Sequence, residues 1–240
     1  RDHYDVRGRV AHESLFNTND GAYRCPSTQQ GYSAFSTWTR GLAWVMLGYA
    51  EELEYLDTLS DEQLLPYGGR EAIEAWMQRA AEADCDFYLH ETPTDGVPYW
   101  DTGAPGLAHL GDYLDRPAEP SNDHEPVDSS AAAIACQGLL RLGRRLKRRQ
   151  ANGRGARYWH AGLTTLRTLL DEPYLATDAK HEGLLLHSIY HRPRGWDHIP
   201  EGSRIPSGES SMWGDYHLIE AALYVQRIAR DLPDCTFFGP

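Results

Sequence analysis

The chain has 240 residues, of which 41% are apolar and 11% aromatic, so it can bury a substantial core in one large domain or two small ones. Its 35 acidic residues outnumber its 23 basic residues and give a formal net charge of −12. This balance argues against nucleic acid and against an anionic membrane as partners, because both bind through a basic surface. An anionic small substrate would need a local cation within the acidic chain.

Cysteine usage and hydropathy exclude two further classes of protein. The cysteines form no C-x-x-C pair, which argues against a zinc site, and no apolar run is long enough to span a bilayer. Cys136 lies in an Ala-rich helical pattern and is predicted to be a small buried apolar residue. The sequence begins with Arg1, so it does not tell whether a signal peptide precedes it.

The stretch at residues 30–44 reads QGYSAFSTWTRGLAW and combines two tryptophans with an arginine and a glutamine. In a helix, Arg40 and Trp44 are i,i+4 neighbours, and Trp38 lies about a turn and a half before Trp44. A sugar acid needs an aromatic plane for its ring face and a forked cation for its carboxylate. The stretch therefore predicts a binding site for an acidic sugar.

Apolar periodicity predicts five long helices, at residues 36–54, 69–91, 128–149, 156–170 and 211–229. The first is apolar nearly all round, which is typical of an inner helix, and Asp128 is predicted to cap the third. The loops at residues 92–126 and 172–210 exceed the usual connection length, as functional loops often do. No region rich in strands is predicted beyond short stretches such as residues 97–100.

Five motifs, in order along nearly the whole chain, resemble glycoside hydrolase family 88, the unsaturated glucuronyl hydrolases. They are QGYS with S-x-W-x-R-G-x-A-W at residues 30–44, DGVPYWD at 95–101, PVDSSAAAIA at 126–135, EGLLLH at 182–187 with His191 and Pro193 following, and WGDY at 213–216. The resemblance implies an all-α fold, an (α/α)6 toroid of six helical hairpins. The family also points to the bacterial cytoplasm or periplasm.

The resemblance implies an enzyme that removes a terminal 4,5-unsaturated glucuronyl residue from oligosaccharides made by a polysaccharide lyase. An aspartic acid protonates the vinyl-ether double bond, water adds to the neighbouring ring carbon, and the glycosidic bond is lost when the hemiketal opens. Neither a cofactor nor a metal is expected. Three alternatives stay open: an unsaturated rhamnogalacturonyl hydrolase, a non-catalytic carbohydrate-binding protein of the same fold, and a helical structural or interaction module.

The chain departs from the family at the catalytic aspartates, which the family carries in two motifs before the W-x-R-G-x-x-W segment. Before Gln30 the chain has only Asp2, Asp5 and Asp20, none in such a context. A closed toroid also needs twelve helices. We therefore expect residues 1–240 to form roughly the C-terminal half of a single (α/α)6 domain, with the catalytic aspartates upstream of Arg1. The missing N-terminal half would be its partner, covering an exposed apolar face.

The resemblance and the residue types together nominate a set of site residues. Arg40 is the principal candidate for substrate binding; the structural alternative is a buried arginine paired with an aspartate. His3 is a candidate to assist the catalytic aspartate, although residues 13–28 resemble an insertion between it and Gln30. The predicted substrate-binding residues are Gln30, Trp38, Arg40, Trp44, Trp213 and Tyr216.

Two other groups of polar residues are not nominated as a metal site or as a catalytic pair. The four histidines of the second long loop, His181, His187, His191 and His198, lie at irregular spacing and predict no metal site. Asp95 and Asp101 flank a turn marked by Gly and Pro, which favours structural use over catalysis.

Overall fold

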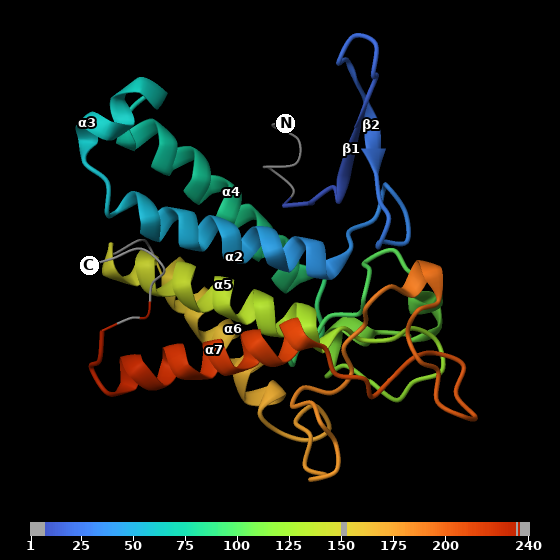
Figure 1. Ribbon diagram of the computed structural model, residues 1–240. Helices are drawn as coiled ribbons and strands as arrows, with labels where there is room; N and C mark the ends of the chain where they lie inside the picture. Colours follow the sequence, from blue (N-terminus) through green and yellow to red (C-terminus); the bar gives the residue numbers. More distant parts are fainter. Residues whose placement is uncertain (1–7, 150–152, 234, 236–240) are drawn as a thin grey trace.

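The computed structural model describes residues 8–149, 153–233 and 235, and the five long helices of this part of the chain form two layers (Figure 1). The inner layer consists of α2 (Thr39–Leu56), α5 (Ser129–Arg148) and α7 (Met212–Ala229), with α5 in contact with the other two. In the outer layer, α4 (Arg70–His90) packs on α2, and α6 (Arg154–Leu169) packs on α5. Ion pairs between Arg154 and Glu82 and between Arg157 and Asp86 join the two outer helices.

All five predicted helices are present, and their ends differ from the prediction by at most three residues. The largest shift is at the start of α2, because a turn closed by hydrogen bonds between Ser33 and Ser36 precedes the helix. The predicted cap of α5 is confirmed: Asp128 Oδ1 accepts from the backbone N–H groups of Ser130 and Ala131 at 3.1 and 3.2 Å. Cys136 is fully buried, as predicted.

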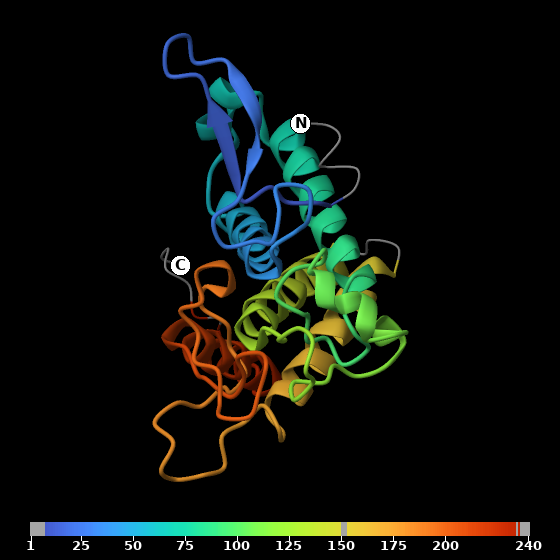
Figure 2. The same ribbon diagram turned by 90° about the vertical axis from the view of Figure 1, so that its right-hand side faces the viewer.

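The sequence analysis missed a β-hairpin, formed by β1 (Glu13–Phe16) and β2 (Tyr23–Ser27), in the segment that resembles an insertion. The hairpin stands away from the helices (Figures 1 and 2), and most of its side chains are exposed. A strand exposed on both faces carries no alternation of apolar and polar residues, so its sequence lacks the usual strand signal. The predicted strand at residues 97–100 contributes a single bridge, between Tyr99 and Val127.

The remaining elements are short and lie in the connections. The helix α3 (Asp61–Leu64) begins with a capping box made by Ser60 and Gln63. Among the described residues, four 3-10 helices follow: η1 (Leu65–Tyr67), η2 (Pro105–His109), η3 (Tyr113–Asp115) and η4 (Arg192–Arg194). No helix of the described residues is both long and apolar enough to cross a bilayer.

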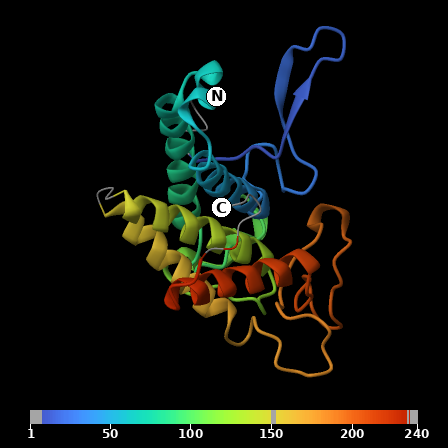
Figure 3. The same cartoon turned by 60° about the vertical axis from the view of Figure 1, so that its left-hand side comes forward.

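The three inner helices run in the same direction, as contacts at both ends demonstrate. At their N-termini, Arg40 of α2 pairs with Asp128 at the start of α5, and Trp213 of α7 donates to Ser130 of α5. At their C-terminal ends, Arg141 of α5 pairs with Glu54 of α2. Three positive helix ends therefore meet at one end of the layer, where the two long loops also gather (Figure 3).

The inner layer also exposes large apolar side chains, as the sequence analysis expects of part of a ring. On α7 the exposed side chains are Met212, Tyr216, Ile219 and Leu223, and on α2 they are Trp44 and Tyr55. An exposed apolar surface of this kind marks an interaction site more often than a free surface.

Close helix packing in the core depends on glycine at the contact between α5 and α6. A Cβ atom at Gly143 would lie 2.6 Å from the backbone nitrogen of Trp159 and 2.9 Å from the carbonyl oxygen of Gly155. Because both obstacles are backbone atoms, they can move only if the two helices separate. The close packing of α5 on α6 thus requires a residue without a side chain at this point.

We expect Gly143→Ala to lower the free energy of unfolding by about 1–3 kcal/mol, the usual cost of overpacking a core. Gly48→Ala is the matched control, because Gly48 also lies in a helix but has no atom within 4 Å of the position of its Cβ. That variant should be neutral or more stable by up to about 1 kcal/mol. Urea denaturation of both variants makes the comparison, and equal effects would contradict the packing argument.

Candidate functional site

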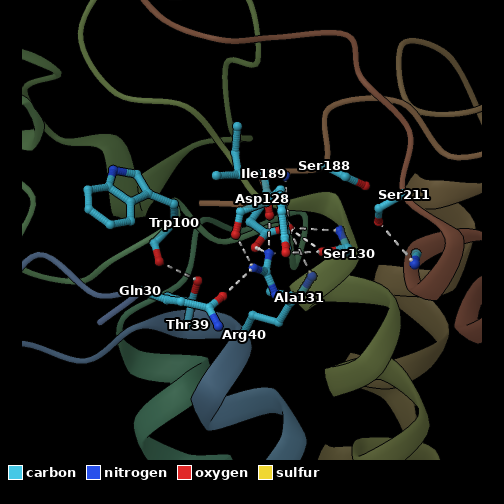
Figure 4. Close-up of polar contacts among 12 residues, drawn as sticks. Gln30, Thr39, Arg40, Trp100, Asp128, Ser130, Ala131, Ser188, Ile189 and Ser211 are labelled. Atoms are coloured by element: carbon cyan, nitrogen blue, oxygen red, sulfur yellow. Dashed lines mark hydrogen bonds and ion pairs between the residues drawn. The ribbon is translucent and has the colours of Figure 1, made fainter. Parts of the chain in front are cut away.

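Arg40, in the first turn of α2, is only 3% exposed and forms the centre of a polar cluster at the N-terminal ends of the inner helices (Figure 4). Its Nη1 donates to Asp128 Oδ2 at 2.6 Å and to the carbonyl of Ile189. Its Nη2 donates to the carbonyl of Tyr190 at 2.7 Å and to Gln30 Oε1 at 3.1 Å. One guanidinium therefore connects the start of α2 to the loop before it, the cap of α5 and the second long loop.

Two indole rings flank the same guanidinium. The guanidinium carbon lies 4.8 Å from the ring centroid of Trp38 and 5.2 Å from that of Trp213. Both distances are within the range of a cation–π contact, which is strongest where water is excluded. The rings and the hydrogen bonds together hold Arg40 in one orientation.

Asp128 is completely buried and serves two helices at once. Besides capping α5 and pairing with Arg40, it accepts from the Ser130 hydroxyl at 2.5 Å. Ser130 Oγ in turn accepts from Trp213 Nε1 at 2.9 Å, so the carboxylate also fixes the first turn of α7. A buried carboxylate of this kind is stable only because each of its oxygens has a donor.

Gln30 presents a hydrogen-bond donor at the edge of this cluster. Its Oε1 accepts from Arg40, so the amide nitrogen of the side chain points away from the guanidinium. Gln30 is half-buried, and this nitrogen can donate to an oxygen of a bound molecule. The Arg40–Asp128 ion pair thereby determines that the nitrogen of the Gln30 amide, and not its oxygen, can bind a ligand.

His12 lies beside Gln30, although the sequence analysis did not nominate it. Its Nδ1 is 3.1 Å from Thr28 Oγ1 and accepts from the backbone N–H groups of Gln29 and Gln30 at 3.2 and 3.4 Å. The proton of the neutral ring must therefore be on Nε2. Burial lowers the pKa of His12; Glu13 opposes this shift, and Arg40 and His191 add to it.

The β-hairpin is what places His12 at the site. The residue directly precedes β1, and Thr28 directly follows β2, so pairing of the two strands brings these residues together. The ring of His12 also packs on Trp38 with centroids 4.6 Å apart. Only recognition of the hairpin could have identified His12 from the sequence.

The structure brings together four of the predicted substrate-binding residues: Gln30, Trp38, Arg40 and Trp213. The burial of Arg40 and its pairing with Asp128 match the structural alternative, and its contact with substrate stays a prediction. Trp38 is 9% exposed and belongs to the core, whereas Trp44 is 40% and Tyr216 49% exposed. Both exposed rings lie farther along their helices, and their roles also stay predictions. His3 lies outside the described residues.

The carboxylates assigned to structural use accept backbone hydrogen bonds. Asp101 binds the N–H groups of Tyr32 and Gly103 at 2.8 and 2.9 Å, which anchors the loop that carries Gln30. Asp95 binds those of Val97 and Ala118. Burial raises the pKa of both carboxyl groups, and these hydrogen bonds oppose the shift. Neither carboxylate belongs to the Arg40 cluster.

The second long loop contributes a buried histidine, His191, that the sequence analysis rejected only as a metal ligand. Its side chain packs on Trp196 with ring centroids 4.8 Å apart. It is 5% exposed, and its Nδ1 has no hydrogen-bond partner among the described residues. Within the same part of the chain, no group of three His, Cys, Asp or Glu side chains could hold a metal ion.

No family model matches the chain, but comparison with known proteins finds relatives that align with most of its sequence. The chain is 30% identical over 216 residues to an unsaturated glucuronyl hydrolase of Bacillus sp. (strain GL1), covering 90% of this chain and 46% of that protein. It is 29% identical to a protein of the same name from Formosa agariphila, covering 88% of this chain and 42% of the relative.

A solved structure agrees with these relatives. The crystal structure of the Bacillus sp. GL1 enzyme, described as responsible for the degradation of glycosaminoglycan, matches with a TM-score of 0.66 and 29% identity. The match covers 92% of this chain and 48% of that one. The chain thus spans about half the length of the relatives it matches, and its two layers of helices correspond to about half of their α/α toroid. These similarities support membership of the chain in glycoside hydrolase family 88, the unsaturated glucuronyl hydrolases, which it matches over about half of their length.

Proposed function

We propose that the protein containing this chain removes a terminal 4,5-unsaturated glucuronyl residue from lyase-generated oligosaccharides by hydrating the vinyl-ether double bond. The supporting relatives carry the name of this activity. The observation in the chain itself that carries the proposal is the Arg40 cluster, which sets a fixed amide donor and indole rings at the ends of three parallel helices. Such a place suits a ring with a carboxylate, because helix N-termini stabilise anions.

The residues of this chain would bind and orient the sugar. The amide nitrogen of Gln30, held outward by Arg40, would donate to an oxygen of the unsaturated ring. Nε2 of His12 would offer a second N–H donor beside it. The exposed indole of Trp44, one helical turn from Arg40, would provide the plane on which the ring face packs. Fixed donors of this kind need no reorganisation when charge develops in the transition state.

The proton for the double bond would come from an aspartic acid of the other half of the ring. We propose that residues 1–240 form part of a single (α/α)6 domain whose N-terminal helices carry this aspartate. Exposed apolar side chains of α2 and α7, Tyr55 and Ile219 among them, belong to the face that those helices would cover. Closing the ring over this face would also exclude water from the Arg40 cluster and strengthen the electrostatic interactions there.

The test is incubation of the complete protein with unsaturated disaccharides made by a polysaccharide lyase, followed by the absorbance of the conjugated double bond. We expect the absorbance to fall and the unsaturated glucuronyl residue to be released. The saturated counterpart of each disaccharide is the control, because hydration has no double bond to act on there. Cleavage of both substrates at similar rates would indicate ordinary glycoside hydrolysis and contradict the proposal. Preference for galacturonyl–rhamnose substrates would favour the rhamnogalacturonyl alternative.

A further inference from the structure

One helical turn along α2 from Arg40, the indole of Trp44 contacts the imidazole of His217 on α7. The two ring centroids lie 5.0 Å apart, and the ring planes make an angle of 72°. Trp44 is 40% exposed, whereas His217 is 7% exposed. The imidazole therefore belongs to the packed layer, and the indole that rests against it belongs to the surface.

Gln137 on α5 holds the imidazole in place. This amide is 2% exposed, and its Nε2 donates to Glu220 Oε2 at 2.9 Å and to the carbonyl of His217 at 3.2 Å. Because both partners of Nε2 are oxygens, Oε1 faces the other way, where Nδ1 of His217 lies 3.1 Å distant. Nδ1 must therefore carry the proton of the ring, and rotation of the ring would break this hydrogen bond.

We propose that Gln137 and His217 are positioning residues that hold the indole of Trp44 in the orientation that binds the sugar ring. The contacts run from α5 through α7 to α2, so all three inner helices determine where the indole lies. An exposed tryptophan without such a neighbour would distribute over several rotamers and lose entropy on binding. The proposal rests on the proposed function in one respect, since it takes Trp44 as the aromatic plane that meets the substrate.

The charged groups around His217 come from each element packed against it. Glu220 Oε2 lies 3.8 Å from Nδ1, and Tyr216 on the same helix packs against the ring. Burial raises the pKa of Glu51 of α2, and Glu220 adds to this shift, whereas Arg141 of α5, which lies 3.6 Å from Glu51, opposes it. Burial lowers the pKa of His217, and Glu220 opposes this shift. His217 is therefore neutral at neutral pH and gains a proton only on acidification.

The first experiment measures tryptophan emission and does not depend on activity. The emission of Trp44 is isolated as the difference between the complete protein and its Trp44→Phe variant, titrated from about pH 8 to about pH 5. We expect the difference to fall on acidification, because an imidazolium quenches an adjacent indole more strongly than a neutral imidazole does. His217→Phe should abolish the change. His160→Phe, which replaces an exposed histidine of α6, should leave it intact.

The second experiment uses kinetics of the complete protein. We expect His217→Ala to raise KM about tenfold and to change kcat less than threefold, because ring stacking stabilises ground state and transition state alike. Gln137→Leu should act in the same direction. His217→Phe keeps an aromatic edge against Trp44 and should restore most of the affinity, which a loss of folded protein would not explain.

Two results would overturn the proposal: an unchanged KM in His217→Ala, or an acid-dependent Trp44 signal that persists in His217→Phe. Failure of the proposed function would look different. In that case the complete protein would not turn over any unsaturated oligosaccharide, while the emission titration would still show that His217 controls the surroundings of Trp44.

Discussion

Arg40→Ala is expected to lower kcat/KM of the complete enzyme at least tenfold, or about 1.4 kcal/mol of transition-state stabilisation. The variant removes the donor that holds Gln30 Oε1 and leaves the Asp128 carboxylate buried without its cation. The kcat/KM of Arg40→Lys should lie between those of the wild type and Arg40→Ala. A single ammonium can face Asp128 but cannot also reach both Gln30 and the carbonyl of Tyr190. Steady-state kinetics on the unsaturated disaccharide, at a temperature where circular dichroism shows folded protein, give the measurement.

A double-mutant cycle separates the action of Arg40 on Gln30 from its other contacts. If Arg40 works mainly by orienting that amide, Gln30→Ala should cause a comparable loss, and the double variant should be less impaired than the sum of the two. Arg157→Ala serves as the control, because this arginine of the outer layer is 55% exposed and should leave kinetics within twofold. Wild-type kcat/KM in a folded Arg40→Ala variant would remove the arginine from the site.

Asp128→Ala should lower the free energy of unfolding by about 3–5 kcal/mol, the cost of leaving one member of a buried ion pair without its partner. The carboxylate is fully buried, and Arg40 would keep an unpaired charge in its place. Loss of the α5 cap contributes about 1 kcal/mol of this total. Asp128→Ser retains a capping hydroxyl without the charge, so its smaller loss would isolate the contribution of the ion pair.

The matched control for this prediction is Glu119→Ala, which breaks the exposed pair between Arg116 and Glu119. Exposed pairs contribute about 0–1 kcal/mol, so this variant should unfold close to the wild type. Chemical denaturation of all variants at one pH provides the values. A loss at Asp128 no larger than the loss at Glu119 would show that the buried pair does not stabilise the cluster.

The helices of this protein were predictable because their signals are local. Apolar periodicity of 3.6 residues identified all five long helices, and the run Asp128, Ser129 and Ser130 identified the start of α5 correctly. The i,i+4 spacing of Arg40 and Trp44 likewise follows from helix geometry alone. The family motifs added the expectation of a toroid, which the comparison with solved structures confirms.

The hairpin and the partners of Arg40 were not predictable in this way. The strands β1 and β2 are mostly exposed and so carry no alternating pattern, and His12 reaches Gln30 only because the strands pair. The carboxylate that neutralises Arg40 lies 88 residues away along the chain, and the carbonyl of Ile189 lies 149 residues away. No local pattern distinguishes Asp128 as a helix cap from Asp128 as an ion-pair partner, because one carboxylate does both.

The sequence by itself thus determined where the long helices begin and end along the chain and which side chains share a face of α2. Periodicity and capping make this possible because they act within a few residues. Only the tertiary structure decided that three helix N-termini meet at one end, that Arg40 is enclosed by Asp128 and two indole rings, and that His217 packs against Trp44. These arrangements depend on which helices pack together and in which direction. Their free energy comes from desolvating charges and rings in contacts between distant segments, which local sequence does not encode.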